Sequence, residues 1–192
     1  MSALPKEDPH YTYADYKEWD LDEGERFELL NGEAFAMSAP SAKHQMILGE
    51  LFAQIHVFLK GKPCKIFPAP FDVRLFYRAD GKDDTVVQPD ISVICDRQKI
   101  GPEGCRGAPD FVVEILSPSN SAIEMQQKLE LYRESGVKEL WIIDPENNLL
   151  TVYLLQGDII YSKNYKKTDT VAVTVLQGLN IALEEIFADN DF

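Results

Sequence analysis

The stretch DFVVEILSPSNSAIEMQQKLELYRESGVKELWIIDP, residues 110–145, decides the expected fold of this chain. Residues 110–117 have the Val, Ile and Leu content of a fully buried strand, and the apolar run 138–145 predicts a second strand. The segment 117–137 between them predicts a helix, with a capping box that begins at Ser121. This order predicts a right-handed crossover between two parallel strands.

Glu114 stands in the middle of the first of these strands, within VVEIL at 112–116. A carboxylate in an apolar strand is costly unless a cation, a hydrogen-bond network, a raised pKa or a metal ion compensates it. Its neighbours leave little room for a solvated face. The residues alone therefore favour a functional role for Glu114 over a structural one, with those four compensations left open.

The segment RFELLNGEAFAMS, residues 26–38, predicts a β-hairpin, because Asn-Gly is the strongest two-residue turn signal. Pairing Leu30 with Glu33 places Glu28 and Glu33 on one face of this hairpin. For hairpin carboxylates considered alone, exposure to solvent is the favoured interpretation.

The rest of the chain completes one α/β domain with a mixed central sheet. A helix is expected over 39–62, with Ser41 as its cap and His44 on its apolar stripe. Residues 1–12 are expected to form a flexible leader, and residues 13–192 the single domain. The segment 65–77 is expected to contain a strand in which Phe71, Val73, Leu75 and Tyr77 alternate with polar or exposed positions. The other expected features are a strand at 85–95 interrupted by Pro89, a loop at 101–110, a hairpin at 147–165 and a strand at 170–176.

The composition is that of an ordinary globular domain, with 45% hydrophobic and 27% charged residues among 192. No run of about 18 apolar residues is present, and the first residues lack the pattern of a secretory signal, so no membrane span is expected. Cys64, Cys95 and Cys105 form no CxxC pair. We therefore expect neither a zinc knuckle nor a disulfide framework, and a reduced cytoplasmic setting.

The net charge of −13 argues against broad nonspecific binding of nucleic acid, which depends on Lys and Arg side chains. It is compatible with a divalent cation site, since such ions bind clustered carboxylates.

Four further residues are candidates for chemistry, each with an ordinary structural alternative. Asp90 follows Pro89 and joins Glu114 as a candidate Mg²⁺ ligand, although it could simply begin a turn. Glu124 and Lys128 could form an exposed i, i+4 ion pair. His44 is as compatible with a hydrogen-bonded core position as with a catalytic one.

Several motifs in order resemble the Uma-type restriction endonuclease family of the PD-(D/E)XK nuclease superfamily. The resemblance runs from about Tyr13 to the LQGLNIALEEIF tail and is specific as an ordered set, whereas each motif alone is weak. Its motifs are ELLNGE, APSAKHQ, QPDISVI, GAPDFVVEILSPS and KLELYRESGVKELWIIDP.

The resemblance implies a restriction-endonuclease-like core with a metal-dependent phosphodiesterase site. Asp90 matches the Asp of the PD half and Glu114 the acid of the second half. The standard lysine position is Leu116 here, and Lys128 matches the variants in which that lysine has moved to the following helix. Asp90, Glu114 and the carbonyl of Ile115 are then expected to hold Mg²⁺ or Mn²⁺.

The same resemblance assigns roles to the remaining candidates. Glu33 matches the acid of the family's first hairpin, with Glu28 beside it, and is expected to complete a second metal position or fix the water network. His44 matches a histidine often found after that hairpin. Glu124 stands where many relatives have Asp, and its side chain carries the same charge on a longer reach.

The expected activity is endonucleolytic hydrolysis of DNA by a cytoplasmic enzyme, and a homodimer is expected because cutting both strands needs two sites. The alternative is a catalytically inactive nuclease-fold module for binding or regulation, which the acidic balance favours. A third and weaker alternative is a phosphohydrolase acting on a small phosphorylated molecule.

Overall fold

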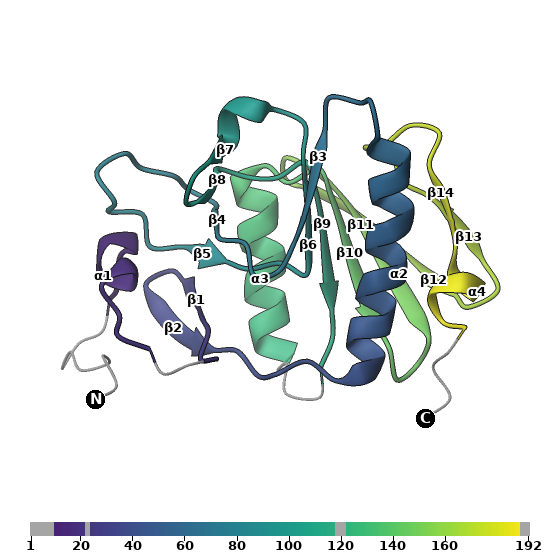
Figure 1. The fold of residues 1–192 in the computed structure, drawn as a ribbon, viewed down its shortest axis with the longest axis horizontal. Helices are drawn as coiled ribbons and strands as arrows, with labels where there is room; N and C mark the ends of the chain where they lie inside the picture. The colour runs from purple at the N-terminus through teal and green to yellow at the C-terminus, as the bar shows by residue number, and fades with distance from the viewer. Residues whose placement is uncertain (1–9, 22–23, 118–121, 189–192) are drawn as a thin grey trace.

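The computed structural model describes residues 10–21, 24–117 and 122–188, and Figure 1 shows their arrangement. The central six-stranded sheet has the order β12-β11-β10-β9-β6-β3. Its strands are β3 (Lys65–Pro68), β6 (Ile91–Ile94), β9 (Phe111–Ile115), β10 (Glu139–Asp144), β11 (Leu149–Gln156) and β12 (Ile159–Lys166).

A second six-stranded sheet, with the order β2-β1-β5-β4-β8-β7, lies at one side of the molecule, and a small two-stranded sheet lies at the other (Figure 1). The second sheet consists of β1 (Phe27–Leu30), β2 (Glu33–Ala36), β4 (Val73–Arg74), β5 (Val86–Val87), β7 (Ile100–Gly101) and β8 (Gly104–Arg106). The small sheet pairs β13 (Thr170–Ala172) with β14 (Asn180–Ala182). The helices are α1 (Tyr13–Lys17), α2 (Ala42–Leu59), the 3-10 turn η1 (Arg97–Lys99), α3 (Ala122–Ser135) and α4 (Leu183–Ile186).

Helices α2 and α3 pack on opposite faces of the central sheet. Val113 of β9 belongs to the apolar cluster that includes the buried stripe of α2, whereas Val112 belongs to the cluster that includes Leu131 and Tyr132 of α3. Side chains alternate along a strand, so Glu114 points to the same face as Val112. The carboxylate is thereby directed towards α3.

The predicted mixed α/β fold is confirmed. Strands β9 and β10 are parallel and joined through α3, as the strand, helix and strand order predicts. The hairpin register is also confirmed, with Leu30 opposite Glu33. Asn31 and Gly32 have φ values of 51° and 81°, the positive pair that a type I′ turn requires. Ser41 caps α2 by accepting a hydrogen bond from the His44 backbone N–H.

The strand expected within 65–77, with Phe71, Val73, Leu75 and Tyr77 alternating, is found only as the short β4, and a separate strand, β3, covers Lys65–Pro68. Pro68 pairs with Ile91 in the central sheet, whereas Val73 pairs with Val87 in the second sheet. Prolines at 68 and 70 lack the backbone N–H that a continuous ladder needs, so the chain changes sheets between them and Val73. The same change occurs between β5 and β6, at Pro89.

The expected loop over 101–110 contains short strands. Ile100 pairs with Cys105, and Gly101 pairs with Gly104, whose φ of 125° allows the tight reversal. Glycine content indicated a loop there, but it does not exclude a two-residue ladder on either side of a turn.

The expectation of unpaired cysteines is wrong for two of the three. Cys64 and Cys95 form a disulfide, while Cys105 is free and buried. The two bonded cysteines are 31 residues apart in sequence and lie at neighbouring ends of the paired strands β3 and β6. No local sequence spacing predicts that they meet.

Part of the expected leader belongs to the fold. Tyr11 is buried and donates its backbone N–H to the Gly32 carbonyl at 2.8 Å, and Thr12 caps α1. Residues 1–9 lie outside the described residues, as does Ser121, the expected cap of α3. Among the described residues, we find no helix with the length and apolar character that crossing a bilayer demands.

Candidate active site

A cavity of about 510 Å³ opens between the hairpin, the N-terminal part of α2, the end of β9 and α3. Its lining brings together residues from Gly24 to Lys128, which are 104 positions apart in the sequence. Its ionisable lining residues include Glu28, His44, Asp90, Glu114, Glu124 and Lys128.

Asp90 is held at the edge of the central sheet, directly before β6. Its Oδ2 accepts the backbone N–H of Ile115 at 2.7 Å, which ties it to the strand that carries Glu114. Its Oδ1 lies 3.1 Å from Nε2 of His44, in the first turn of α2. These contacts fix the carboxylate of Asp90 between the two elements.

Lys128 lies between two carboxylates in the interior. Its Nζ is 2.7 Å from Oε2 of Glu28 and 3.1 Å from Oε1 of Glu114. Glu28, Glu114 and Lys128 are 2%, 7% and 3% exposed, so the three charges are shielded from bulk water. The partner cation and the hydrogen-bond network that could compensate Glu114 are therefore both present.

Tyr132 completes this cluster. It lies one helical turn after Lys128, and its hydroxyl donates to Oε1 of Glu114. Among the contacts of the described residues, those of Glu114 all go to Oε1.

Burial controls the ionisation of the cluster. It raises the pKa of Glu114 to about 7; the positive charge of Lys128 opposes this shift, while the negative charges of Glu28 and Asp90 add to it. Burial acts to lower the pKa of Lys128, but Glu114 and Glu28 outweigh it and raise that pKa above its ordinary value. Lys128 therefore keeps its positive charge between the two carboxylates.

Glu28 is held from the other side by the segment that precedes Asp90. The backbone N–H of Gln88 donates to Oε1 of Glu28 at 2.7 Å, and its side-chain amide donates to Tyr16 and Asp72 at 3.1 and 2.9 Å. Burial raises the pKa of Asp72, against the hydrogen bonds from Gln88 and Tyr16. This polar network ties the hairpin to the residue that directly follows β5.

The structure groups most of the predicted site residues. Asp90, Glu114, Ile115 and Lys128 line the cavity, together with the supporting residues Glu28, His44 and Glu124. Glu33 does not line it and is exposed at the turn end of the hairpin, opposite Leu30. Glu28 thus occupies the site from the hairpin.

Sequence reasoning missed Tyr132 and Gln88. Tyr132 carried a usable signal, because its i+4 spacing from Lys128 places both on one face of α3. Gln88 had a weaker sequence signal, namely its position two residues before Asp90. Its contacts depend on the long-range pairing of β5 with β1, which local sequence does not encode.

The oxygen donors of the cavity are of the type that magnesium and manganese ions bind. Among the described residues, no group of three or more His, Cys, Asp and Glu side chains is placed to hold a metal. Mg²⁺ does not require such a group, since it is usually bound through one or two carboxylates and keeps several waters. The oxygens of Asp90 and Glu114, with the Ile115 carbonyl, are the candidate protein donors.

The fold and the cluster of acids with a buried lysine define a nuclease-type domain of the restriction-endonuclease-like class. The chain belongs to the Uma2 family, described as "Putative restriction endonuclease", which matches residues 13–184. Family membership supports a nuclease function.

Three similar proteins are consistent with this assignment. An uncharacterized protein of Synechocystis sp. (strain ATCC 27184 / PCC 6803 / Kazusa), slr1290, is 24% identical over 93% of this chain and 92% of its own length. A second one from that strain, sll1609, is 24% identical over 69% of this chain and 74% of its own. The crystal structure of "a putative nuclease belonging to DUF820" from Anabaena variabilis ATCC 29413 has a TM-score of 0.74 and 22% identity, over 93% of this chain and 98% of that one, and shares the fold.

Proposed function

We propose that this chain is a metal-dependent endonuclease that hydrolyses phosphodiester bonds in DNA. The observation that carries the proposal is the position of Lys128, whose ammonium joins Glu28 and Glu114 in the cavity that also contains Asp90. A buried cation in contact with the candidate metal ligand Glu114 suits a reaction in which negative charge develops on a phosphate.

Asp90, Glu114 and the Ile115 carbonyl would hold Mg²⁺ or Mn²⁺. When bound, such an ion supplies an activated water and polarises the scissile phosphate. Lys128 acts as a charged donor that orients the water or offsets phosphate charge, because its two carboxylate partners keep it protonated. His44 and the Ile115 N–H position Asp90, and Tyr132 positions Glu114.

The hairpin acid is the part of the proposal on which sequence and geometry differ. The family pattern points to Glu33, whereas the contacts with Lys128 and Gln88 favour Glu28. Either could fix the water network or complete a second metal position.

The charge distribution supports a second candidate, a nuclease-fold module that binds or regulates without cutting. The chain carries 32 acidic against 19 basic residues. Arg26, His44 and Lys128 are the basic residues in the described lining of the cavity, which is a small number for a DNA-binding surface.

A cleavage screen tests the proposal. Supercoiled, linear and branched DNA are incubated with the wild type in Mg²⁺ or Mn²⁺, with Glu114→Gln and the exposed Glu50→Gln as a matched pair. We expect metal-dependent cleavage by wild type and Glu50→Gln, and a loss of at least 100-fold in Glu114→Gln. Glu114→Gln keeps the volume of the side chain, whereas Lys128→Ala would leave two buried carboxylates without their cation and endanger the fold.

Equal cleavage by Glu114→Gln and wild type would contradict the site. Metal-dependent binding of DNA with no cleavage by the wild type would instead favour the regulatory module.

Analytical ultracentrifugation of the same samples tests the proposed homodimer. Localisation of the tagged chain in intact cells tests the proposed cytoplasmic setting.

A further inference from the structure

The Cys64–Cys95 disulfide lies at the end of the ladder between β3 and β6. Cys64 directly precedes β3, Cys95 directly follows β6, and their neighbours Lys65 and Ile94 are register partners. β3 is the edge strand of the central sheet, so the disulfide fastens that edge to the strand beside it. Both cysteines are only half-buried, which leaves the bond within reach of small molecules.

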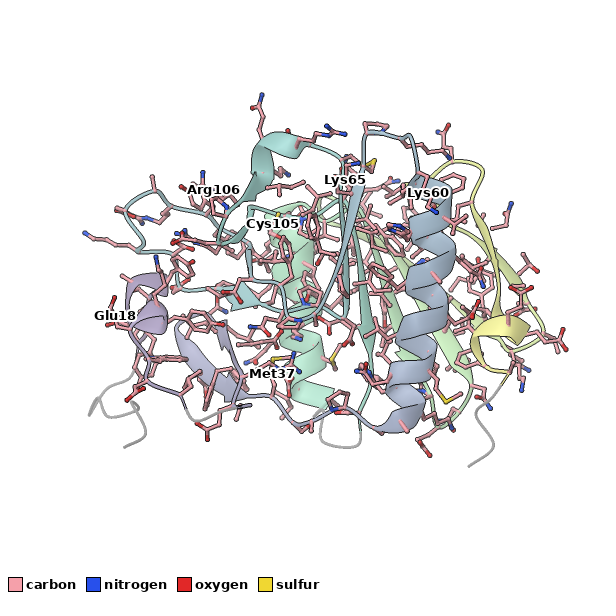
Figure 2. The ribbon with its side chains drawn as sticks, viewed as in Figure 1. Glu18, Met37, Lys60, Lys65, Cys105 and Arg106 are labelled. Atoms are coloured by element: carbon pink, nitrogen blue, oxygen red, sulfur yellow. A yellow bond between two sulfur atoms is a disulfide. The ribbon has the colours of Figure 1, made fainter. Side chains whose placement is uncertain are left out.

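A groove of about 200 Å³ gives access to one of the two sulfur-bearing residues. Its lining includes Cys64, His56, Lys60 and Lys65, whereas Cys95 is not among the lining residues described. Figure 2 shows Lys60 and Lys65 at the same end of the molecule, near the end of α2. A reagent that enters this groove meets Cys64.

The surroundings of the groove are basic in a chain that is acidic as a whole. Lys60, Lys62 and Lys65 are exposed, and Arg97 is brought beside them by a 3.4 Å hydrogen bond from its Nε to the Pro63 carbonyl. The acid nearest in sequence to Cys95 is Asp96, and its Oδ1 accepts the Gln98 backbone N–H of its own turn at 3.0 Å. The local charge therefore favours an anion.

We propose that the Cys64–Cys95 disulfide is a thiol-exchange site whose groove accepts small anionic thiols. The incoming thiol gives its proton to solvent, and its thiolate attacks Cys64 Sγ. A new disulfide forms between Cys64 and the reagent while the bond to Cys95 breaks. The electron pair leaves on Cys95 Sγ, which takes a proton from solvent.

The chemistry of accessible disulfides supports this assignment, which goes beyond the proposed nuclease activity. Exchange requires that the thiolate reach a sulfur along an open path, and exposed disulfides are the labile and regulatory ones. Disulfides in reducing compartments are mostly transient or redox-sensing. Lys60 and Lys65 line the groove and would raise the local concentration of a negatively charged thiolate beside Cys64.

The test compares three small thiols on the oxidised full chain: 3-mercaptopropionate, 2-mercaptoethanol and 2-aminoethanethiol, at equal thiolate concentration and low salt. The reaction is stopped with acid, free thiols are alkylated, and peptides are mapped by mass spectrometry. We expect the reagent on Cys64 and the alkyl group on Cys95. The anionic thiol should react about tenfold faster than the cationic one, with the neutral thiol between them.

The double variant Lys60→Gln/Lys65→Gln should bring the three rates to within about twofold of one another. Lys82→Gln, an exposed lysine of the 78–84 loop, is the matched control and should keep the full ratio. The proposal is overturned if the adduct forms on Cys95, if the three thiols react alike with the wild type, or if a mildly oxidised sample contains no Cys64–Cys95 bond.

Discussion

Glu28 and Glu33 lie five residues apart on one hairpin, and their environments differ sharply. Glu28 is 2% exposed and contacts Lys128 and Gln88, whereas Glu33 is exposed at the turn. A carboxylate that holds the buried lysine should matter more to catalysis than one in solvent. We expect Glu28→Gln to lower DNA cleavage about 10- to 100-fold, because a hydrogen bond to a charged group contributes roughly 1.5–3 kcal/mol.

Glu33→Gln is the companion variant and should stay within about twofold of wild type. Initial cleavage rates at saturating metal measure both, and thermal melts show whether each variant is folded. The opposite order, with Glu33→Gln impaired and Glu28→Gln active, would restore the family assignment of Glu33.

Glu139 is a buried acid outside the cavity, at the start of β10. Its Oε1 accepts Trp141 Nε1–H at 2.8 Å and its Oε2 accepts the Val175 N–H at 2.9 Å. Burial raises its pKa above the ordinary value, against the hydrogen bonds from Val175 and Trp141. As pH rises past about 4.5, the unfolded chain loses this proton before the folded one does. The contribution of Glu139 to stability is therefore highest in acid and falls up to its raised folded pKa.

The difference in unfolding free energy between wild type and Glu139→Gln, from urea titrations at several pH values, measures this effect. The wild type should lose stability relative to the variant on going from pH 4 to pH 7, by about 1.4 kcal/mol for each unit of pKa difference. A wild type that gains stability relative to Glu139→Gln over this range would contradict the assignment.

At the scale of elements, Gly104 and Gly61 both have a positive φ, but only at Gly104 would an added Cβ also clash with a neighbour. Comparing an alanine at each position therefore distinguishes the cost of the backbone conformation from the cost of the clash. A Cβ on Gly104 (φ +125°) would lie 2.1 Å from the Asp72 carbonyl oxygen, whereas one on Gly61 (φ +77°) would meet nothing within 4 Å. Gly104→Ala should therefore lower the unfolding free energy by about 3 kcal/mol or more, and Gly61→Ala by about 1 kcal/mol. Chemical denaturation of the two variants measures both losses of unfolding free energy. Similar losses would contradict the close approach of Gly104 in β8 to the Asp72 carbonyl oxygen.

Elements whose signals are local could be predicted from the sequence. The hairpin register follows from Asn31-Gly32, the start of α2 from Ser41, and the β9–α3–β10 crossover from apolar periodicity. Glu114 stood out because it interrupts a strongly apolar strand, whereas the roles of Asp90 and Lys128 came from the resemblance to the family and stay predictions. The buried position of Glu28 required the pairing of β1 with β5, which no local pattern encodes.

Segments that change sheets could not be predicted. The segments 65–77 and 85–95 each contribute to two different sheets, and only the second carried a sign of this, the expected interruption at Pro89. An alternating pattern indicates only that one face of a strand is buried. Pairing with either sheet would bury that face, so the pattern does not tell which sheet the strand joins. The disulfide escaped prediction for a related reason, because Cys64 and Cys95 meet only after β3 has paired with β6.

At the scale of the whole molecule, the charge of −13 opposes both compaction and the approach of DNA. The structure places opposite charges at two separate regions: an acidic cluster around Lys128 in the cavity, and exposed lysines near the end of α2. His44 and Lys60 are 16 residues apart on or beside that helix, about 24 Å along its axis. The basic end is therefore too far from the cavity to neutralise its acids directly.

The disulfide should contribute to the stability of the whole domain, since it closes a loop with a sequence separation of 31. Loop-closure entropy for that length corresponds to about 3–4 kcal/mol of destabilisation of the unfolded chain. Reduction should lower the unfolding free energy by about that amount, measured by guanidinium titration with and without a phosphine reductant. The double variant Cys64→Ser/Cys95→Ser should unfold like the reduced wild type and no longer respond to the reductant. If its stability instead equals that of the oxidised protein, the bond adds nothing to the fold, and its accessible position beside the basic groove would then have to be explained by exchange chemistry alone.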